Sequence, residues 1–187
     1  LDHGQRERFR INATEYLDAA VYAAWVDTLQ AKSTNTQVTT LIDTCESGTF
    51  VDDLAAANRI TMTSAGAGPI EGVAIFDQQK LISFSLVFWS TVFSGATYGQ
   101  ACSQAKAAIE SVNPPQAPQI ADNGNGIANE LSDGQTAGNT RPGGSFETTR
   151  TGVFIGEVAS DQAVSTNSAT LWLGEVVSLF PVDAAGA

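Results

Sequence analysis

The sequence predicts an α/β fold in which a parallel sheet is flanked by helices. Two short β-branched segments, residues 37–42 and 59–64, have the composition of strands that are covered on both faces. Helical patterns precede, separate and follow these strands, at residues 12–31, 50–58, 83–93 and 98–111. This alternation with short connections builds a parallel sheet, and ligands bind beyond the carboxyl ends of such strands.

The first predicted helix, residues 12–31, has large apolar side chains at every fourth position: Leu17, Val21, Trp25 and Leu29. Asn12 followed by Glu15 fits a capping box, and Asp18 adds negative charge near the amino end of the helix. We therefore expect this stripe to face the core, with Trp25 as one of its anchors.

The predicted helices 83–93 and 98–111 are also expected to pack against the sheet. In the first of them, Phe88 and Trp89 are expected to be core anchors. The second places small and apolar side chains on one face: Ala101, Cys102, Ala105, Ala108 and Ile109. Cys102 is therefore expected to be packed and unreactive, and together with Cys45 it implies no disulfide framework.

The character of the chain changes after residue 112. Residues 113–147 are rich in Pro, Gly and Asn without apolar periodicity, which is typical of a linker, and residues 148–187 contain two predicted strands, 152–158 and 169–180. We interpret the last segment as the start of an accessory β-rich domain or as a returning hairpin. A calcium loop is an alternative for Asp122, Asn123, Asn125 and Asp133, but Ala121 occupies its first ligand position, which favours a polar linker.

Composition and charge narrow the class of protein and its partners. The 187 residues suffice for one domain, and the net charge of -11 repels nucleic acid and anionic membranes. The longest apolar stretch, residues 81–93, is interrupted by Ser and Thr, so we predict no membrane span. Few charges and many Ser, Thr, Asn and Gly residues favour a secreted or periplasmic bacterial protein.

The residues best suited to chemistry are His3 and Cys45. His3 is the only histidine, and Cys45 follows the first predicted buried strand. A histidine beside a thiol can take its proton and later protonate a leaving amine. The interval between the two residues accommodates one crossover helix between parallel strands, so both can lie at one sheet edge.

The residues around this pair resemble a known signature. Asp2-His3-Gly4 and the box Asp43-Thr44-Cys45-Glu46-Ser47-Gly48 are similar to the paired motifs of the caspase, legumain and metacaspase superfamily, also called clan CD. Residues 9–12, 25–29 and 59–65, and the segment 83–89, resemble bacterial legumain-like peptidases. The resemblance covers roughly residues 1–112, and the tract 122–134 is similar to an acidic, Gly-rich tract of some of those proteins.

The resemblance implies a cysteine endopeptidase that works without metal or cofactor on a peptide or protein substrate. It assigns Cys45 as the nucleophile, His3 as the base, and the amides of Gly4 and Cys45 as the oxyanion hole. It also implies that Asp43 and Ser64 line the substrate pocket. The residue preferred before the scissile bond stays open, because Asn, Asp or Arg would suit such a pocket.

The same resemblance implies strands ahead of the His-Gly motif. The given chain has two residues before His3, so we expect an incomplete caspase-like three-layer sandwich without its first strands, and the missing N-terminal part of the domain is an expected partner. The competing hypothesis is a non-catalytic binding or structural module of a larger secreted or surface protein.

Overall fold

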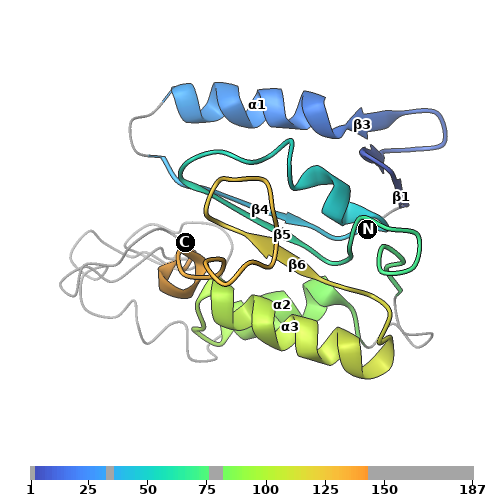
Figure 1. Ribbon diagram of the computed structural model, residues 1–187, viewed down its shortest axis with the longest axis vertical. Coiled ribbons are helices and arrows are strands. Elements are labelled where there is room, and N and C mark those ends of the chain that lie inside the picture. Colours follow the sequence, from blue (N-terminus) through green and yellow to red (C-terminus); the bar gives the residue numbers. More distant parts are fainter. Residues whose placement is uncertain (1–2, 33–35, 76–81, 143–187) are drawn as a thin grey trace, which may run out of the picture.

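The computed structural model describes residues 3–32, 36–75 and 82–142, and it shows a mixed α/β fold (Figure 1). Two three-stranded sheets and three α-helices make up its regular structure. The first sheet contains β1 (Gly4–Gln5), β2 (Arg8–Arg10) and β3 (Tyr16–Asp18), and the second contains β4 (Val38–Ile42), β5 (Arg59–Thr63) and β6 (Gln119–Ala121). The helices are α1 (Ala19–Ala31), α2 (Phe84–Phe93) and α3 (Tyr98–Val112). The predicted α/β class is confirmed.

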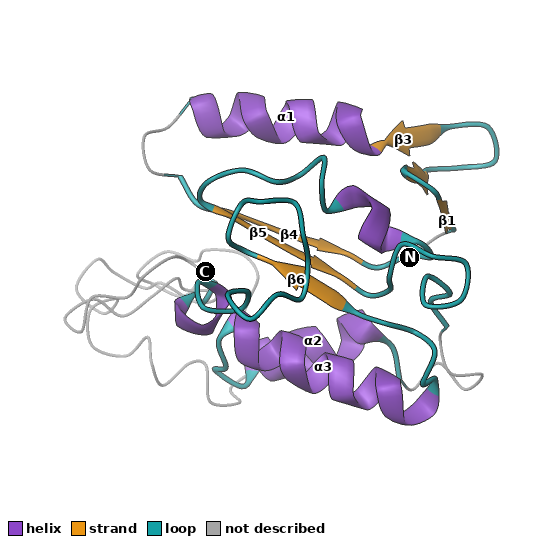
Figure 2. Cartoon of the chain, viewed as in Figure 1, coloured by secondary structure: helices purple, strands orange, loops and turns teal. Residues whose placement is uncertain are grey.

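The second sheet is the centre of the molecule, with helices on both of its faces (Figure 2). Strands β4 and β5 are parallel and pair from Val38 with Arg59 to Ile42 with Thr63, as the two β-branched segments predicted. Strand β6 pairs antiparallel with β5, so the order is β4-β5-β6. One face packs on α1, and the other packs on α2 and α3.

The two faces of the sheet bury separate cores. The core under α1 contains Ala19, Ala23, Val26, Ile42, Phe50 and Leu54. The core under α2 and α3 contains Ile60, Met62, Phe84, Phe88, Val92, Ala101, Cys102, Ala105, Ile109 and Ala137. The predicted buried face of α3 is therefore confirmed, and so is the role of Phe88 as a core anchor. The same prediction for Trp89 is wrong, because Trp89 is 39% exposed and packs against the edge of the Phe88 ring from outside the core.

The start of the predicted helix 12–31 is wrong, because β2 and β3 form an antiparallel hairpin there. The Asn12 side chain accepts hydrogen bonds from the N–H groups of Thr14 (2.9 Å) and Glu15 (3.0 Å). These bonds close the turn between the two strands instead of capping a helix. The helix starts only at Ala19, with Asp18 as its N-cap residue.

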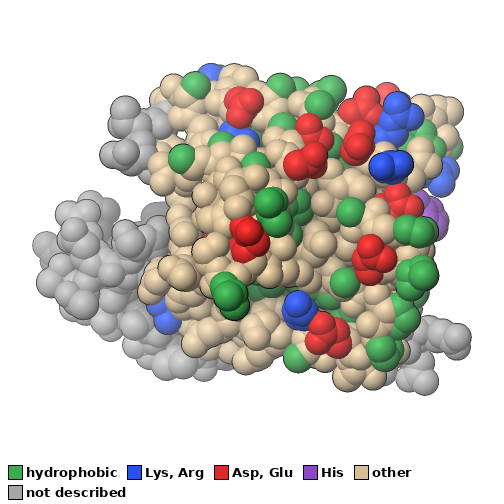
Figure 3. Space-filling view, in the orientation of Figure 1, with side chains coloured by type: hydrophobic (Ala, Val, Ile, Leu, Met, Phe, Trp, Pro, Cys, Tyr) green, Lys and Arg blue, Asp and Glu red, His purple; other side chains and the backbone are tan. Residues whose placement is uncertain are grey.

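The apolar stripe of α1 faces outward, which also corrects the prediction. Val21, Trp25 and Leu29 are exposed, at 44%, 58% and 56%, and Leu17 lies on β3. The buried face consists of Ala19, Ala23 and Val26, whose small side chains let the helix approach the sheet closely. Hydrophobic side chains are visible along the outer edge of the molecule over α1 (Figure 3).

A buried arginine fixes α1 over the sheet. Arg59, at the start of β5, is 5% exposed. Its guanidinium donates to Gln30 Oε1 (2.8 Å) and to the Leu54 carbonyl (3.3 Å), and it forms an ion pair with Asp27. A buried guanidinium is stable only when its donors are satisfied, so α1 and β5 are tied at this point.

Of the three remaining helix predictions, one is wrong and two match the structure. The predicted helix 50–58 is wrong, since a 3₁₀ turn (Ser47–Phe50) leads into irregular turns. Glu46 (φ 52°) and Asn58 (φ 61°) have left-handed backbones that bound this stretch at both ends. In contrast, α2 and α3 match their predictions, because Ser83 and Thr97 each accept an N–H bond as N-cap residues.

Part of the predicted linker 113–147 belongs to the packed domain. Strand β6 extends the central sheet, and Gln116 and Ala137 are buried. The buried Asp122 carboxylate accepts the N–H groups of Gly134 and Ala137, each at 2.9 Å. The predicted strands 152–158 and 169–180 lie outside the described residues. Within the described part of the chain, no helix is long and apolar enough to cross a bilayer.

We expect Phe88→Ala to lower the free energy of unfolding by about 3–5 kcal/mol, because it leaves a cavity between α2 and the sheet. Leu86→Ala on the same helix should cost about 1 kcal/mol or less, since Leu86 is 49% exposed. Urea denaturation of both variants measures the difference. Equal costs would show that Phe88 is not part of a tightly packed core.

Candidate functional site

Cys45 lies just beyond the carboxyl end of β4, where the sequence places it. It is partly buried, and its Sγ donates a hydrogen bond to the Ala74 carbonyl oxygen at 3.6 Å. Strand β5 runs parallel to β4 and ends beside it at Thr63. The thiol therefore sits at the edge of the sheet where parallel strands present functional groups.

The His3–Gly4 segment lies directly against this edge. A Cβ atom added to Gly4 would collide with the Cys45 carbonyl oxygen and with the Thr44 side chain. The His3 carbonyl accepts the N–H of Arg10 at 2.9 Å, which holds this segment to β2, and the His3 side chain is exposed. The structure thus packs Gly4, the first residue of β1, against Cys45 beyond the end of β4, and His3 precedes this contact in the chain.

The turn after Cys45 is clamped to the loop that follows β5. The Glu46 N–H bonds to the Gly72 carbonyl at 2.6 Å. Buried Ser47 accepts the N–H of Ala65 at 3.0 Å and donates to the Ala65 carbonyl at 3.3 Å. These contacts fix the backbone on the carboxyl side of the thiol, as a preorganised site requires.

The loop 64–75 is in turn held by Gln116, a residue that the sequence analysis did not single out. Gln116 is 1% exposed, and its Nε2 donates to the Ser64 carbonyl at 2.7 Å. Its Oε1 accepts the Ile75 N–H at 3.1 Å, so one side chain joins both ends of the loop that carries Ala74. Burial of a glutamine between two prolines has no local sequence signal.

Asp43 and Ser64 lie at the ends of β4 and β5 but are bonded within the protein. The Asp43 carboxylate is buried and accepts both the N–H and the Oγ–H of Ser85. Ser64 is fully buried, and its Oγ donates to the Thr44 carbonyl at 3.4 Å. Asp43 therefore ties the end of β4 to the first turn of α2, where a negative charge is stabilised by the helix dipole.

A hollow of about 970 Å³ opens between the β1–β2 turn, the start of α1 and Glu46. Its lining includes Gln5 and Glu46, which follow Gly4 and Cys45 in the chain, but neither Gly4 nor Cys45 itself. The full lining is Gln5, Arg6, Glu7, Arg8, Asp18, Ala19, Ala20, Glu46 and Asp53. Arg8 is paired with Asp18 at 2.7 Å, so carboxylates outnumber the remaining cation.

The charges of this hollow shift the pKa of one carboxyl group, that of Asp53. Burial raises the pKa of Asp53, and the nearby charges of Asp52 and Glu7 raise it further. Like charges destabilise the ionised carboxylate, so a cation that enters the hollow is favoured there.

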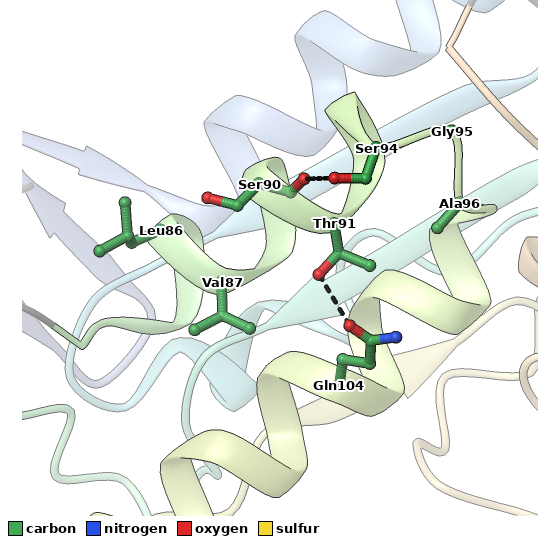
Figure 4. A pocket seen from close by; sticks show the side chains of 8 residues that line it. All are labelled: Leu86, Val87, Ser90, Thr91, Ser94, Gly95, Ala96 and Gln104. Carbon is green, nitrogen blue, oxygen red and sulfur yellow. Dashed lines mark hydrogen bonds between the residues drawn. The ribbon is translucent and has the colours of Figure 1, made fainter. Parts of the chain in front are cut away.

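A second hollow, of about 650 Å³, lies between α2 and α3 (Figure 4). The Thr91 hydroxyl donates to Gln104 Oε1 at 3.0 Å, and the Ser94 hydroxyl donates to the Ser90 carbonyl at 2.8 Å. Leu86 and Val87 line its other end. No residue of its lining is titratable, so the lining offers no base to activate the hydroxyls of Ser90, Thr91 and Ser94.

The other cysteine is unsuited to chemistry. Cys102 is 4% exposed, in the core beneath α3, and burial raises the pKa of its thiol to about 12, slightly offset by Lys106. It therefore stays protonated near neutral pH. This confirms the prediction that Cys102 is packed, and both cysteines are free thiols.

The described residues contain no group of three or more His, Cys, Asp or Glu side chains that could hold a metal ion. In the tract proposed as an alternative calcium loop, Asn123 Oδ1 accepts the Asn125 N–H at 3.0 Å, and Asp133 accepts the N–H groups of Asp122 and Glu130. These bonds shape a loop against the sheet.

Comparison with known proteins adds no relative. No family model matches the sequence, and a search of curated proteins finds no match.

We expect Gln116→Ala to destabilise the fold by about 1–3 kcal/mol, because it leaves the buried Ser64 carbonyl without this partner. The amide of Ile75 should then exchange with deuterium faster. Gln135→Ala is the control, since Gln135 is exposed and its side chain holds no loop. Unchanged exchange at Ile75 would rule out a role for Gln116 in fixing the loop.

Proposed function

We propose that this protein is a cysteine endopeptidase of the caspase and legumain type, with Cys45 as nucleophile and His3 as general base. One observation carries the proposal: a Cβ added to Gly4 would collide with the Cys45 carbonyl oxygen, so the residue after the only histidine of the sequence packs against Cys45. The Glu7 N–H also bonds to Thr49 Oγ1 at 2.8 Å, which holds the β1–β2 turn against the 3₁₀ turn that follows Cys45.

The proposed reaction uses only groups of this site. The Cys45 proton passes to the His3 ring while Sγ attacks the scissile carbonyl carbon, and the amides of Gly4 and Cys45 stabilise the oxyanion. His3 then gives the proton to the leaving amine as the C–N bond breaks. Water, deprotonated by His3, hydrolyses the resulting thioester and releases the acid product and the free thiol.

The arrangement of layers supports a finer proposal for the fold. Helix α1 covers one face of the central sheet and α2 and α3 cover the other, as in a caspase-like three-layer sandwich (Figure 1). Among the described residues, β4 pairs only with β5, so its outer edge is where further strands of such a sandwich would attach. The proposed partner there is the N-terminal part of the same domain.

The charges near the site favour one kind of substrate side chain in this proposal. The hollow lined by Gln5 and Glu46 carries more carboxylates than cations, which in this proposal favours Arg over Asn or Asp as a recognised side chain. Asp43 and Ser64 remain the proposed pocket residues. The Asp43 side chain is hydrogen-bonded to Ser85, and the Ser64 side chain is hydrogen-bonded to the Thr44 carbonyl. In this proposal the two residues therefore position the pocket wall through these bonds.

Near neutral pH, iodoacetamide should alkylate Cys45 far faster than Cys102, whose pKa of about 12 leaves almost no thiolate. Labelling of Cys102 should rise only as the pH approaches that value. His3→Ala should slow alkylation of Cys45 about tenfold or more, because the proton acceptor is removed. Mass spectrometry of labelled peptides measures both rates, with Gln5→Ala as the control for changes in this segment.

Equal and slow labelling of the two cysteines would contradict the peptidase proposal and favour the non-catalytic binding or structural module. Hydrolysis of peptides with Asn, Asp or Arg before the scissile bond then tests turnover directly, with Cys45→Ala as the inactive control.

Gly4→Ala should reduce alkylation of Cys45 about as much as His3→Ala, because the added Cβ pushes the His3 segment away from Cys45. Gly138→Ala is the matched control, since a Cβ there meets nothing within 4 Å. Circular dichroism confirms that both variants fold. Rapid labelling in folded Gly4→Ala would show that the contact does not position His3.

A further inference from the structure

The turn that carries Cys45 is bonded to two carbonyl groups of residues 71–75. The Glu46 N–H donates to the Gly72 carbonyl at 2.6 Å, and Cys45 Sγ donates to the Ala74 carbonyl at 3.6 Å. A thiol is a weak donor, so its bond favours one of the three staggered positions of the sulfur without fixing the backbone. The position of Sγ therefore depends on where the Ala74 carbonyl is placed.

The residues on either side of Ala74 are bonded to another part of the chain. The Val73 carbonyl accepts a hydrogen bond from Asn113 Nδ2 at 3.4 Å, and the Ile75 N–H donates to Gln116 Oε1 at 3.1 Å. Val73 and Ile75 are the two neighbours of Ala74 in the chain. The carbonyl that receives the thiol is thus held from both sides by Asn113 and Gln116.

A third bond joins the same two segments. The Ala117 N–H donates to the Glu71 carbonyl at 3.1 Å. Residues 71–75 belong to no helix or strand, so no regular ladder of backbone bonds fixes them in place. The bonds from residues 113–117 therefore join this segment to the packed domain.

Asn113 and Gln116 are themselves firmly placed. Asn113 is the C-cap residue of α3, and its N–H donates to the Ile109 carbonyl at 2.7 Å. The Gln116 N–H donates to the Asn113 carbonyl at 3.0 Å, and Asn113 Nδ2 donates to Gln116 Oε1 at 3.3 Å. Ile109 is fully buried in the core beneath the sheet, and Gln116 is 1% exposed. The pair is therefore anchored to the end of α3.

We propose that Asn113 and Gln116 are positioning residues for Cys45, and that they act on its thiol through residues 71–75. Their side chains bond to the backbone on both sides of Ala74, and the Ala74 carbonyl bonds to Sγ. The end of α3 is in this way coupled to the turn that follows β4. The effect of this coupling on turnover rests on the proposed function, in which Cys45 is the nucleophile.

The expected consequence for the reaction is a sulfur atom that is already in place. A cysteine side chain without a partner samples several rotamers, and only the one that directs Sγ at the scissile carbonyl can attack. Asn113 and Gln116 do not line the hollow that contains Gln5 and Glu46. Loss of either side chain should therefore lower kcat and leave KM nearly unchanged.

Raman spectroscopy of the S–H stretching band tests the position of the thiol, because this band moves to lower frequency when the thiol donates a hydrogen bond. Subtracting the spectrum of the matching Cys45→Ala protein removes the contribution of Cys102. The band of the unaltered chain should be that of a hydrogen-bonded thiol. In Asn113→Ala and in Gln116→Met it should shift to the frequency of a free thiol, and kcat for a peptide that the unaltered chain hydrolyses should fall about tenfold or more.

Ser111→Ala is the matched control in the last turn of α3, because the Ser111 hydroxyl donates to the Ala108 carbonyl of the same helix. Its band and its kcat should equal those of the unaltered chain. Circular dichroism shows which variants fold, and Asn113→Ala serves where Gln116→Met does not, since Asn113 is only partly buried. A folded variant that is merely less stable keeps the band of the unaltered chain.

A free-thiol band in the unaltered chain would overturn the proposal, and so would an unchanged band in the folded variants. An unchanged kcat in a variant whose band has moved would overturn it equally. Absence of turnover in the unaltered chain would contradict the peptidase proposal instead, and the S–H band would then decide whether Asn113 and Gln116 position the thiol.

Discussion

The parallel pairing of β4 with β5 is the constraint on which the other features of this protein depend. Its register, Val38 with Arg59 through Ile42 with Thr63, places both amino ends together and both carboxyl ends together. At the amino ends, Arg59 reaches back to hold α1. At the carboxyl ends, the turn after Cys45 meets the loop after β5. A slip of one residue would turn every side chain to the opposite face and separate both sets of contacts.

The elements of the fold that could be predicted are those whose sequence signals lie within one short segment. Strands β4 and β5 and helices α2 and α3 carry their signals locally, in β-branched runs and in Ser83 and Thr97 caps. The β2–β3 hairpin was missed because Asn12 followed by Glu15 suits a tight turn as well as a helix cap. The orientation of α1 was missed because its alanine face is apolar too, and spacing alone favours the larger side chains.

The candidate site could likewise be predicted from the sequence only in part. His3 and Cys45 could be selected because the histidine is unique in the sequence and both belong to short motifs, and the close packing of Gly4 against Cys45 depends on the absence of a side chain at Gly4. The partners of Asp43 and Ser64 could not be predicted. Ser85 lies 42 positions from Asp43, and Gln116 lies 52 positions from Ser64. Such bonds depend on how the helices return over the sheet, which no local pattern records.

The two halves of the proposed dyad differ in mechanical support. Cys45 is fixed by the central sheet and by the Gln116-held loop, whereas His3 rests on β1, a strand of two residues in a small separate sheet. Small hairpins are stable only when they pack against something larger, and here the support is the Gly4 contact with Thr44 and Cys45. The position of His3 in the proposed dyad therefore depends on a contact that exists only because Gly4 has no side chain.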